Sequence, residues 1–204
     1  MTKILIATRN PGKQHEIRPM VADLPYDFVF PDEIGLHETA TENTIESEST
    51  FEGNATRKAE YFSRLSGLPT AAEDSGIEVF ALQGAPGVRS RRFAMPAPNQ
   101  DEANNTELLR RLAGAPESKR AARYRCEVVL IPQPGGIPRV FSGMCRGRVL
   151  EAPVGTGGFG YDPLFFSEEL GKSFGEATLD EKATVSHRAR AFQAFVEWLR
   201  AHPL

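Results

Sequence analysis

The chain has 204 residues, of which 40% are hydrophobic and 25% charged, and its formal net charge is -3. This ordinary globular composition excludes two large domains, and we expect one domain over residues 1–204, possibly with two lobes. The small negative charge argues against a nucleic-acid polymer as partner, but it leaves room for a small phosphate ligand.

Cysteine content and hydropathy bear on the compartment. Two cysteines, Cys126 and Cys145, make neither a disulfide framework nor a metal quartet, which favours a reducing compartment. The first apolar run, "ILIA", is too short for a signal peptide, and no stretch approaches the roughly 18 apolar residues of a spanning helix. These features predict a soluble, cytoplasmic protein with no membrane partner.

Apolar patterning predicts an α/β fold. Strands are expected at Lys3–Ala7, Tyr26–Phe30, Ile77–Leu82, Tyr124–Pro132 and Met144–Glu151. Helices are expected after the cap Asn10, over Phe51–Leu65, over Asp101–Leu112 and after the cap Ser186, with Pro19 shortening or bending the first. The "QPGGIP" segment is typical of a hairpin turn, so the sheet should be mixed.

The first strand leads into "TRNPGK". This loop lacks the glycine spacing of a Walker phosphate loop, yet backbone amides at a helix start, with Thr8, Asn10 and Lys13, would suit an anion. Its place after the first strand favours a ligand site, because open α/β sheets bind ligands at strand ends. The alternative is a capped helix with an exposed lysine.

Two stretches carry acidic residues. In "AAEDSGIEVF", Glu73 and Asp74 are adjacent, so only one of them would face a given pocket if the chain is extended there. Carboxylate oxygens suit Mg²⁺, and one carboxylate can also deprotonate a water. The alternative is an acidic turn. Upstream, Glu42, Glu46 and Glu48 are candidates for a second Mg²⁺ ligand.

The segment "GTGGFGYDP" is unusually rich in glycine, which indicates positive φ or close approach to a ligand. Phe159 and Tyr161 offer stacking surfaces for a base, and Asp162 can accept hydrogen bonds from ring N–H groups. The alternative is a loop packed on its own aromatic residues. Further on, His187 and Arg188 at a helix start could donate to a purine 6-keto oxygen.

Taken in order, five stretches resemble the Ham1/inosine triphosphate pyrophosphatase family over almost the whole chain: "TRNPGK", "EDSG", "GAPGVRSRR", "GTGGFGYDP" and "EKATVSHR". The resemblance implies Mg²⁺-dependent hydrolysis of inosine, deoxyinosine and xanthosine triphosphates to the monophosphate and pyrophosphate. It also implies an elongated α/β fold with a long mixed sheet, two lobes flanking an active-site cleft, and a homodimer.

The resemblance assigns roles to particular residues. Glu46 and Asp74 would hold Mg²⁺, with Asp74 also accepting a proton from the attacking water, and Ser75 would touch the nucleotide. The triphosphate would be held by Thr8, Asn10 and Lys13, in a substrate-binding loop that includes Arg9, Pro11 and Gly12. The base would be held by Phe159, Gly160, Tyr161, Asp162, Lys182, His187 and Arg188.

Two positions depart from the family's pattern. Gly53 stands where the family often has a carboxylate, so that any role of this side chain is lost or moved to Glu52. Ala183 stands where a polar residue is common, which should loosen local capping but leave Lys182 in place. Three alternative functions remain: a Maf-type pyrophosphatase for modified pyrimidine triphosphates, a P-loop-like kinase, and a non-catalytic nucleotide-binding module.

Overall fold

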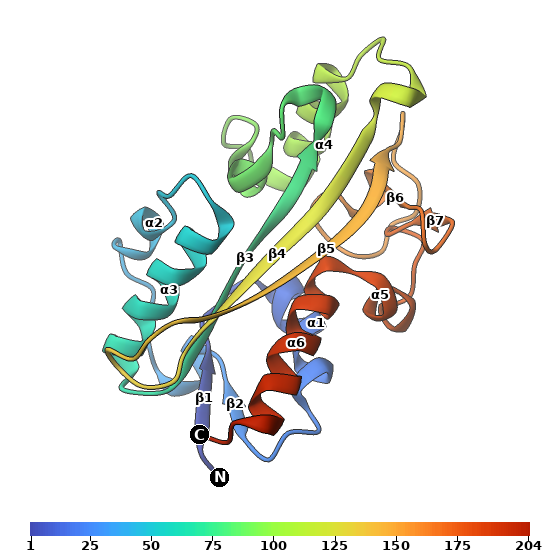
Figure 1. The fold of residues 1–204 in the computed structure, drawn as a ribbon. Coiled ribbons are helices and arrows are strands. Elements are labelled where there is room, and N and C mark those ends of the chain that lie inside the picture. Colours follow the sequence, from blue (N-terminus) through green and yellow to red (C-terminus); the bar gives the residue numbers. More distant parts are fainter. The chain divides into compact units, whose positions relative to one another are not determined.

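The computed structural model describes residues 1–42 and 44–204 of the chain (Figure 1). Its α-helices are α1 (Pro11–Val21), α2 (Glu42–Ile45), α3 (Phe51–Ser66), α4 (Gln100–Arg111), α5 (Leu179–Val185) and α6 (His187–Ala201). Its strands are β1 (Lys3–Ile6), β2 (Asp27–Val29), β3 (Thr70–Val79), β4 (Ala121–Ile131), β5 (Arg139–Val149), β6 (Phe165–Ser167) and β7 (Lys172–Ser173).

The strands form a seven-stranded sheet in the order β2-β1-β3-β4-β5-β6-β7. Strand β1 pairs in parallel with β2 and β3, whereas β6 pairs antiparallel with β5 and β7. The predicted mixed α/β fold is therefore confirmed. No helix among the described residues is long and apolar enough to cross a membrane.

Two predicted strands were misplaced. Strand β3 begins at Thr70 and not at Ile77, so the "EDSG" segment lies inside a strand and the acidic-turn interpretation was wrong. The expected end at Leu82 falls in a short 3₁₀ helix instead. Strand β5 begins at Arg139, five residues before the expected Met144. Acidic and polar residues disfavour strands locally, but burial and pairing in the sheet override that preference.

Helix boundaries follow the predicted caps closely. The Asn10 side chain accepts from the backbone of Lys13 at the start of α1, and Pro19 lies inside this helix two residues before it ends. Helix α3 stops at Gly67, whose φ of 72° is the left-handed conformation that glycine adopts freely. Ser186 precedes α6, and its hydroxyl accepts from the backbone of Ala189.

The chain divides into two compact units, each built from separate segments. Unit 1 comprises Met1–Asp74, Cys126–Gly143 and Arg190–Leu204, and unit 2 comprises Ser75–Arg125 and Met144–Ala189. Strands β3, β4 and β5 contribute residues to both. In β3 the boundary falls between two predicted site residues, Asp74 and Ser75.

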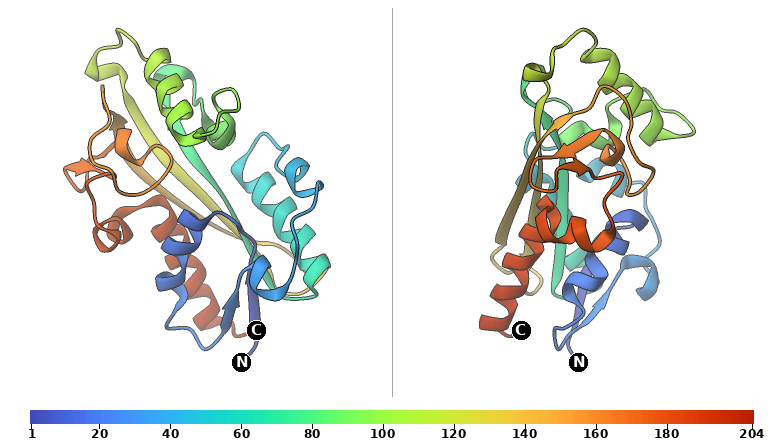
Figure 2. Two further views of the ribbon diagram at one scale, coloured as in Figure 1. Left: turned by 180° about the vertical axis from the view of Figure 1, so that it is seen from behind. Right: turned by 90° about the vertical axis from the view of Figure 1, so that its right-hand side faces the viewer.

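Unit 1 has helices on both faces of its part of the sheet, because successive strand residues point to opposite sides. Ile4 and Ile6 belong to the same core as Ile17 of α1 and Phe192 and Phe195 of α6. Leu5 of β1, and Ala7 just after the strand, pack on the other side with Ala55, Ala59 and Phe62 of α3. Helices α1 and α6, from opposite ends of the chain, lie side by side (Figure 2).

Unit 2 has its own core. Ile77 of β3, Leu108 of α4 and Tyr124 of β4 pack there with aromatic side chains from the segment after β5, among them Phe165 and Phe174. The glycine-rich loop, residues 155–162, is attached to this core through Tyr161 and the buried residues that follow it.

Candidate active site

The opening loop leaves the sheet at the end of β1, after Ile6 pairs with Ala71 of β3 and the Ala7 amide donates to the Ala71 carbonyl at 2.7 Å. The loop is ordered by its own side chains. Thr8 Oγ1 accepts from the Asn10 amide at 3.3 Å, and Asn10 Oδ1 accepts from the Lys13 amide at 3.0 Å. The start of α1 and the lysine therefore lie at a strand end, where α/β folds place ligands.

Lys13 pairs with the first carboxylate of "EDSG". Its Nζ atom lies 3.0 Å from Glu73 Oε1, and the Glu73 side chain is fully buried. The Cys126 thiol donates to the other oxygen of Glu73 at 3.4 Å. Glu73 thus holds the lysine of the opening loop against the sheet, a function that the sequence did not suggest.

Asp74, the second carboxylate, faces α3. Its Oδ2 atom accepts a hydrogen bond of 2.9 Å from Nδ2 of Asn54, and the residue is 7% exposed. One helical turn further along, Lys58 forms an ion pair with Glu46. Asn54, Lys58, Glu46 and Asp74 therefore make a polar cluster between α3 and β3.

The pKa shifts show that these charges influence one another. Burial raises the pKa of Asp74 above its ordinary value, against the opposing charges of Lys58 and Lys13. Burial by itself would lower the pKa of Lys58, but Glu46 and then Asp74 outweigh it and raise the pKa. Lys58 therefore stays protonated at neutral pH, beside a carboxylate with an increased affinity for a proton.

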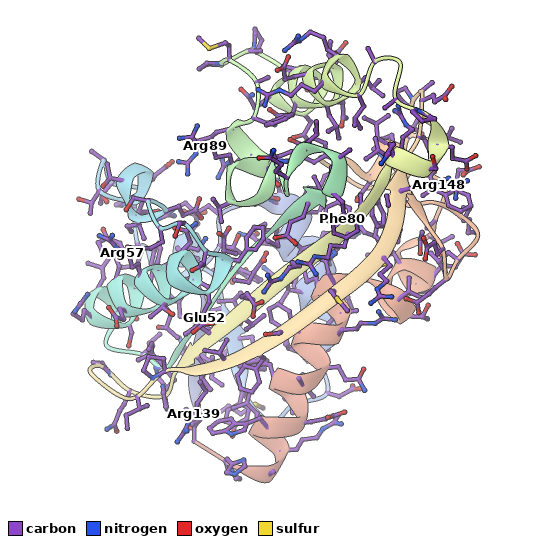
Figure 3. The ribbon with its side chains drawn as sticks, turned by 45° about the horizontal axis from the view of Figure 1, so that its top comes forward. Glu52, Arg57, Phe80, Arg89, Arg139 and Arg148 are labelled. Atoms are coloured by element: carbon purple, nitrogen blue, oxygen red, sulfur yellow. The ribbon has the colours of Figure 1, made fainter. Side chains whose placement is uncertain are left out.

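The three candidate glutamates have different partners. Glu42 accepts two hydrogen bonds, of 2.8 and 3.1 Å, from the Arg9 guanidinium. Glu48 pairs at 2.7 Å with Arg57, which is labelled on α3 in Figure 3. Of the three, Glu46 is the one whose charge acts on both Lys58 and Asp74.

Arg9, which was predicted as part of the substrate-binding loop, binds within the protein. Besides Glu42, its guanidinium contacts Asp32 and donates to the Leu36 carbonyl at 2.8 Å. These bonds tie the opening loop to the acidic segment, and they direct the guanidinium to protein acceptors.

The carboxylates of Glu46 and Asp74 suit a magnesium site in which the protein supplies only two ligands. Among the residues that the structure describes, no group of three or more His, Cys, Asp or Glu side chains could enclose a metal ion. Mg²⁺ commonly takes only one or two carboxylates and leaves its other positions to water and phosphate oxygens. Glu46 and Asp74, the hard oxygen donors beside Lys58, suit such a site.

In unit 2, Asp162 organises the glycine-rich loop. Its Oδ2 atom accepts from the Phe159 amide at 2.9 Å and from Lys182 Nζ at 2.5 Å, while the Tyr124 hydroxyl donates to Oδ1 at 3.5 Å. At Gly158, whose φ is 72°, a Cβ atom would lie 2.1 Å from the same carboxylate. The loop therefore requires glycine there and is closed around a buried ion pair.

Cationic groups surround the ring of Phe159. Lys182 Nζ lies 5.2 Å and Arg188 Cζ 5.5 Å from its centroid. Arg188 also donates to Ser75 Oγ at 3.0 Å, and the buried ring of His187 stacks on Tyr124 with centroids 4.5 Å apart. The structure thus brings together, within unit 2, the base-site residues that the sequence predicted.

Tyr161 has a structural contact. Its hydroxyl donates to the Ser90 carbonyl at 2.7 Å, and burial raises its pKa, so that the hydroxyl keeps the proton it donates. Ser90 in turn accepts from the backbone of Ile77 and thus fixes the 3₁₀ helix Gly87–Arg92 beside β3.

Asn54 and Lys58 were not predicted as site residues. A signal was present: they are polar residues four apart on a helix whose apolar face is formed by Phe51, Ala55, Ala59 and Phe62. The sequence did not show that Asn54 and Lys58 would face Asp74, because this depends on how α3 packs on β3.

A sequence model of the Ham1 family matches residues 4–198. The chain belongs to the Ham1 family. A relative from Geobacter sulfurreducens, named dITP/XTP pyrophosphatase, is 44% identical over 195 residues, which cover 94% of this chain and 93% of that protein. A Thermus thermophilus protein of the same name is 40% identical over 201 residues, covering 98% and 93%.

Solved structures of similar proteins share the fold. A HAM1 protein from Coxiella burnetii superimposes with a TM-score of 0.87 at 31% identity, covering 98% of this chain and 100% of that chain. A Mycobacterium abscessus protein described as nucleoside-triphosphatase / dITP/XTP pyrophosphatase gives a TM-score of 0.75 at 35% identity, covering 96% and 99%.

Gly53 and Ala183, the two positions that differ from the Ham1 pattern, have defined contacts in the structure. A Cβ atom on Gly53 would lie 2.9 Å from Glu48 Cβ, so this glycine allows the acidic segment to approach α3 closely. Ala183 is exposed on α5, where a capping box between Thr178 and Glu181 is intact. The cap hydrogen bonds are therefore formed with Ala183 in place, and Lys182 is buried.

Proposed function

We propose that the protein hydrolyses inosine, deoxyinosine and xanthosine triphosphates to the monophosphate and pyrophosphate. The observation that carries the proposal is the cluster of Lys13, Lys58, Glu46 and Asp74 at the end of β1 and along β3. The two lysines could bind phosphate and the two carboxylates a metal ion, and all four lie in one cluster. Relatives named dITP/XTP pyrophosphatase, more than 40% identical over nearly the whole chain, support the same substrates.

In this proposal unit 1 binds the triphosphate and performs the reaction. Thr8, Asn10 and Lys13 bind phosphate oxygens, and Lys58 adds a second positive charge. Asp74 accepts a proton from a water that attacks the α-phosphorus, the bond to the bridging oxygen breaks, and pyrophosphate leaves. Asn54 fixes the direction of the Asp74 carboxylate, as a general base that must face its water requires.

Glu46 and Asp74 would hold Mg²⁺, which when bound supplies positive charge that offsets the charge developing on the phosphates. Glu46 is favoured over Glu42 and Glu48 because its charge acts on Asp74, whereas these two pair with Arg9 and Arg57.

Unit 2 would select the base. Phe159 would stack on the purine ring, and Ser75 would contact the nucleotide. His187 and Arg188 would donate to the 6-keto oxygen of hypoxanthine or xanthine. Adenine carries an amino group there and would leave these donors unpaired, at a cost of about 1–3 kcal/mol for each buried group. Asp162 and Lys182, bonded to each other, would shape the loop that carries the ring.

We also propose that residues 1–204 act as one domain in the cytoplasm, where the buried thiols Cys126 and Cys145 would stay reduced. The continuous family match over residues 4–198 supports a single domain.

A homodimer is proposed on the face of β3–β5 in unit 2. Phe80, labelled in Figure 3, is 54% exposed and Met144 of β5 is 40% exposed. Arg123 lies over the Phe80 ring, and Glu78 of β3 pairs with Arg123 and Arg125 of β4. A surface that carries both charge signs around apolar side chains suits a second copy of itself, as a two-fold interface requires. Light scattering of Phe80→Glu should give a monomer, and Ile137→Glu, a change at an exposed turn residue, should leave the dimer intact.

A substrate panel with Mg²⁺, assayed for pyrophosphate, tests the proposed reaction. ITP, dITP and XTP should be cleaved, and ATP and GTP much more slowly. Preference for modified pyrimidine triphosphates would indicate a Maf-type enzyme, and phosphoryl transfer without pyrophosphate a kinase. Absence of any Mg²⁺-dependent turnover would leave a nucleotide-binding module.

A further inference from the structure

Two side chains of helix α4 hydrogen-bond to one residue of the glycine-rich loop, Gly160. The Gly160 amide donates to Asp101 Oδ2 at 2.8 Å, and Asn105 Nδ2 donates to the Gly160 carbonyl at 3.0 Å. Asp101 and Asn105 are four residues apart and so share one face of the helix. The two contacts fix the peptide units on both sides of Gly160, whose φ is 62°.

The requirements of α4 itself do not explain these two side chains. The helix already has a cap, because Asn99 Oδ1 accepts from the Glu102 amide at 3.3 Å. Asparagine is a poor helix former, and Asn105 Oδ1 is buried without a hydrogen-bond partner among the described residues. A buried, unpaired acceptor lowers stability, so the stability of α4 does not account for an asparagine at this position. We attribute it to the hydrogen bond that the Asn105 amide donates to Gly160.

The hydrogen bonds to Gly160 also restrain the backbone of the neighbouring residue, Phe159. The Phe159 amide is bound by Asp162, and the Phe159–Gly160 peptide is bound by Asp101. The backbone that carries the ring is therefore fixed at both of its amides, although Gly158 and Gly160 alone would allow many conformations. The ring is held in this way beside Lys182 and Arg188.

We propose that Asp101 and Asn105 are positioning residues for base recognition: they hold Gly160 so that Phe159 is ordered before the nucleotide arrives. Neither residue touches the substrate. A ring that is fixed in advance loses no further conformational freedom on binding, and its alignment with His187 and Arg188 lets these donors distinguish a keto oxygen from an amino group. This inference rests on the proposed function.

Paired variants separate the effect of these hydrogen bonds on base recognition from their effect on the stability of the fold. Asp101→Ala removes the acceptor for the Gly160 amide, whereas Asp101→Asn keeps an oxygen there. Asn105→Ala removes the second contact. Thr106→Ala, a change at an exposed position of the same helix, is the matched control.

For Asp101→Ala and Asn105→Ala we expect KM for ITP to rise roughly tenfold, the effect of one strong hydrogen bond. The kcat value should change less than KM, and the preference for ITP over ATP should fall. Asp101→Asn and Thr106→Ala should retain the wild-type KM and preference. A loss of thermal stability with unchanged KM and base preference would mean a purely structural role and would overturn the proposal.

Hydrogen exchange gives a readout that needs no activity. Peptides covering residues 155–163 should exchange faster in Asp101→Ala than in Asp101→Asn, and equal protection would also overturn the proposal. Failure of the wild-type protein to cleave ITP would refute the proposed function instead. Wild-type cleavage with an unchanged Asp101→Ala variant would refute the positioning role alone.

Discussion

The Asn54 amide lies between the backbone of Glu48 and the carboxylate of Asp74. Its oxygen accepts from the Glu48 amide at 2.8 Å, and its nitrogen donates to Asp74 Oδ2 at 2.9 Å. The two bonds fix the orientation of the side chain, because its oxygen must face an N–H group. Helix α3 therefore positions both the acidic segment and the proposed general base.

Replacing Asn54 by Asp tests this link. The variant keeps an oxygen for the Glu48 amide but replaces the donor to Asp74 with a second carboxylate, and like charges this close repel. We expect kcat for ITP to fall by about 10- to 100-fold, with the loss of one oriented hydrogen bond and of the ionised base. Steady-state kinetics measure it, and an unchanged kcat would show that Asp74 needs no orientation by α3.

Lys58 is expected to act on the triphosphate. Lys58→Met keeps the aliphatic stem and removes the charge, so kcat/KM for ITP should fall by about 100-fold through lost charge stabilisation. Arg57→Met removes the neighbouring, exposed cation, which pairs with Glu48, and should stay within about twofold because exposed pairs contribute little. Equal losses in both variants would point to a general electrostatic effect.

Gly53 tests the close approach of the acidic segment. Gly53→Glu restores the family's carboxylate but places a Cβ atom 2.9 Å from Glu48 Cβ. Overpacking should cost about 1–3 kcal/mol, partly offset by up to about 1 kcal/mol of helix preference. Urea unfolding should therefore show a net destabilisation, while Glu52→Ala on the exposed side should be nearly neutral. A Gly53→Glu variant that is more stable than wild type would mean that the acidic segment around Glu48 can move away from α3 at little cost.

Acidification should weaken the α5 cap. Lys172 and the Thr178 amide hold the pKa of Glu181 below its ordinary value of 4.5. The ionised carboxylate therefore stabilises the fold above that value, and the contribution is lost as the pH falls through the lowered pKa. The stability difference between wild type and Glu181→Ala should shrink from pH 6 to pH 3. A difference that is constant with pH would exclude an ionised cap.

The sequence was sufficient for the parts of the site that are local in the chain. The caps at Asn10 and Ser186, the glycine loop around Asp162, and His187 with Arg188 were all apparent from neighbouring residues. Their structural partners were not. Lys13 binds Glu73, and Asp162 binds Lys182, and neither pairing follows from spacing along the chain.

Strand β3 shows why the rest was missed. The segment from Thr70 to Gly76 contains two carboxylates and a Ser-Gly pair, which locally favour a turn. Inside the sheet, alternation directs Glu73 and Asp74 to opposite sides, where Lys13 and Asn54 meet them. These partners come from distant segments, so their energy overrides a local preference and is not visible in a short window of sequence.

The role of Asp74 is tested most directly by Asp74→Asn, a change that keeps the shape of the side chain and removes its basicity. We measure binding of ITP with Mg²⁺ by calorimetry and pyrophosphate release in the same preparation. Turnover should be lost while triphosphate binding largely survives, because the cationic groups remain. Hydrolysis at the wild-type rate in this variant would contradict the account.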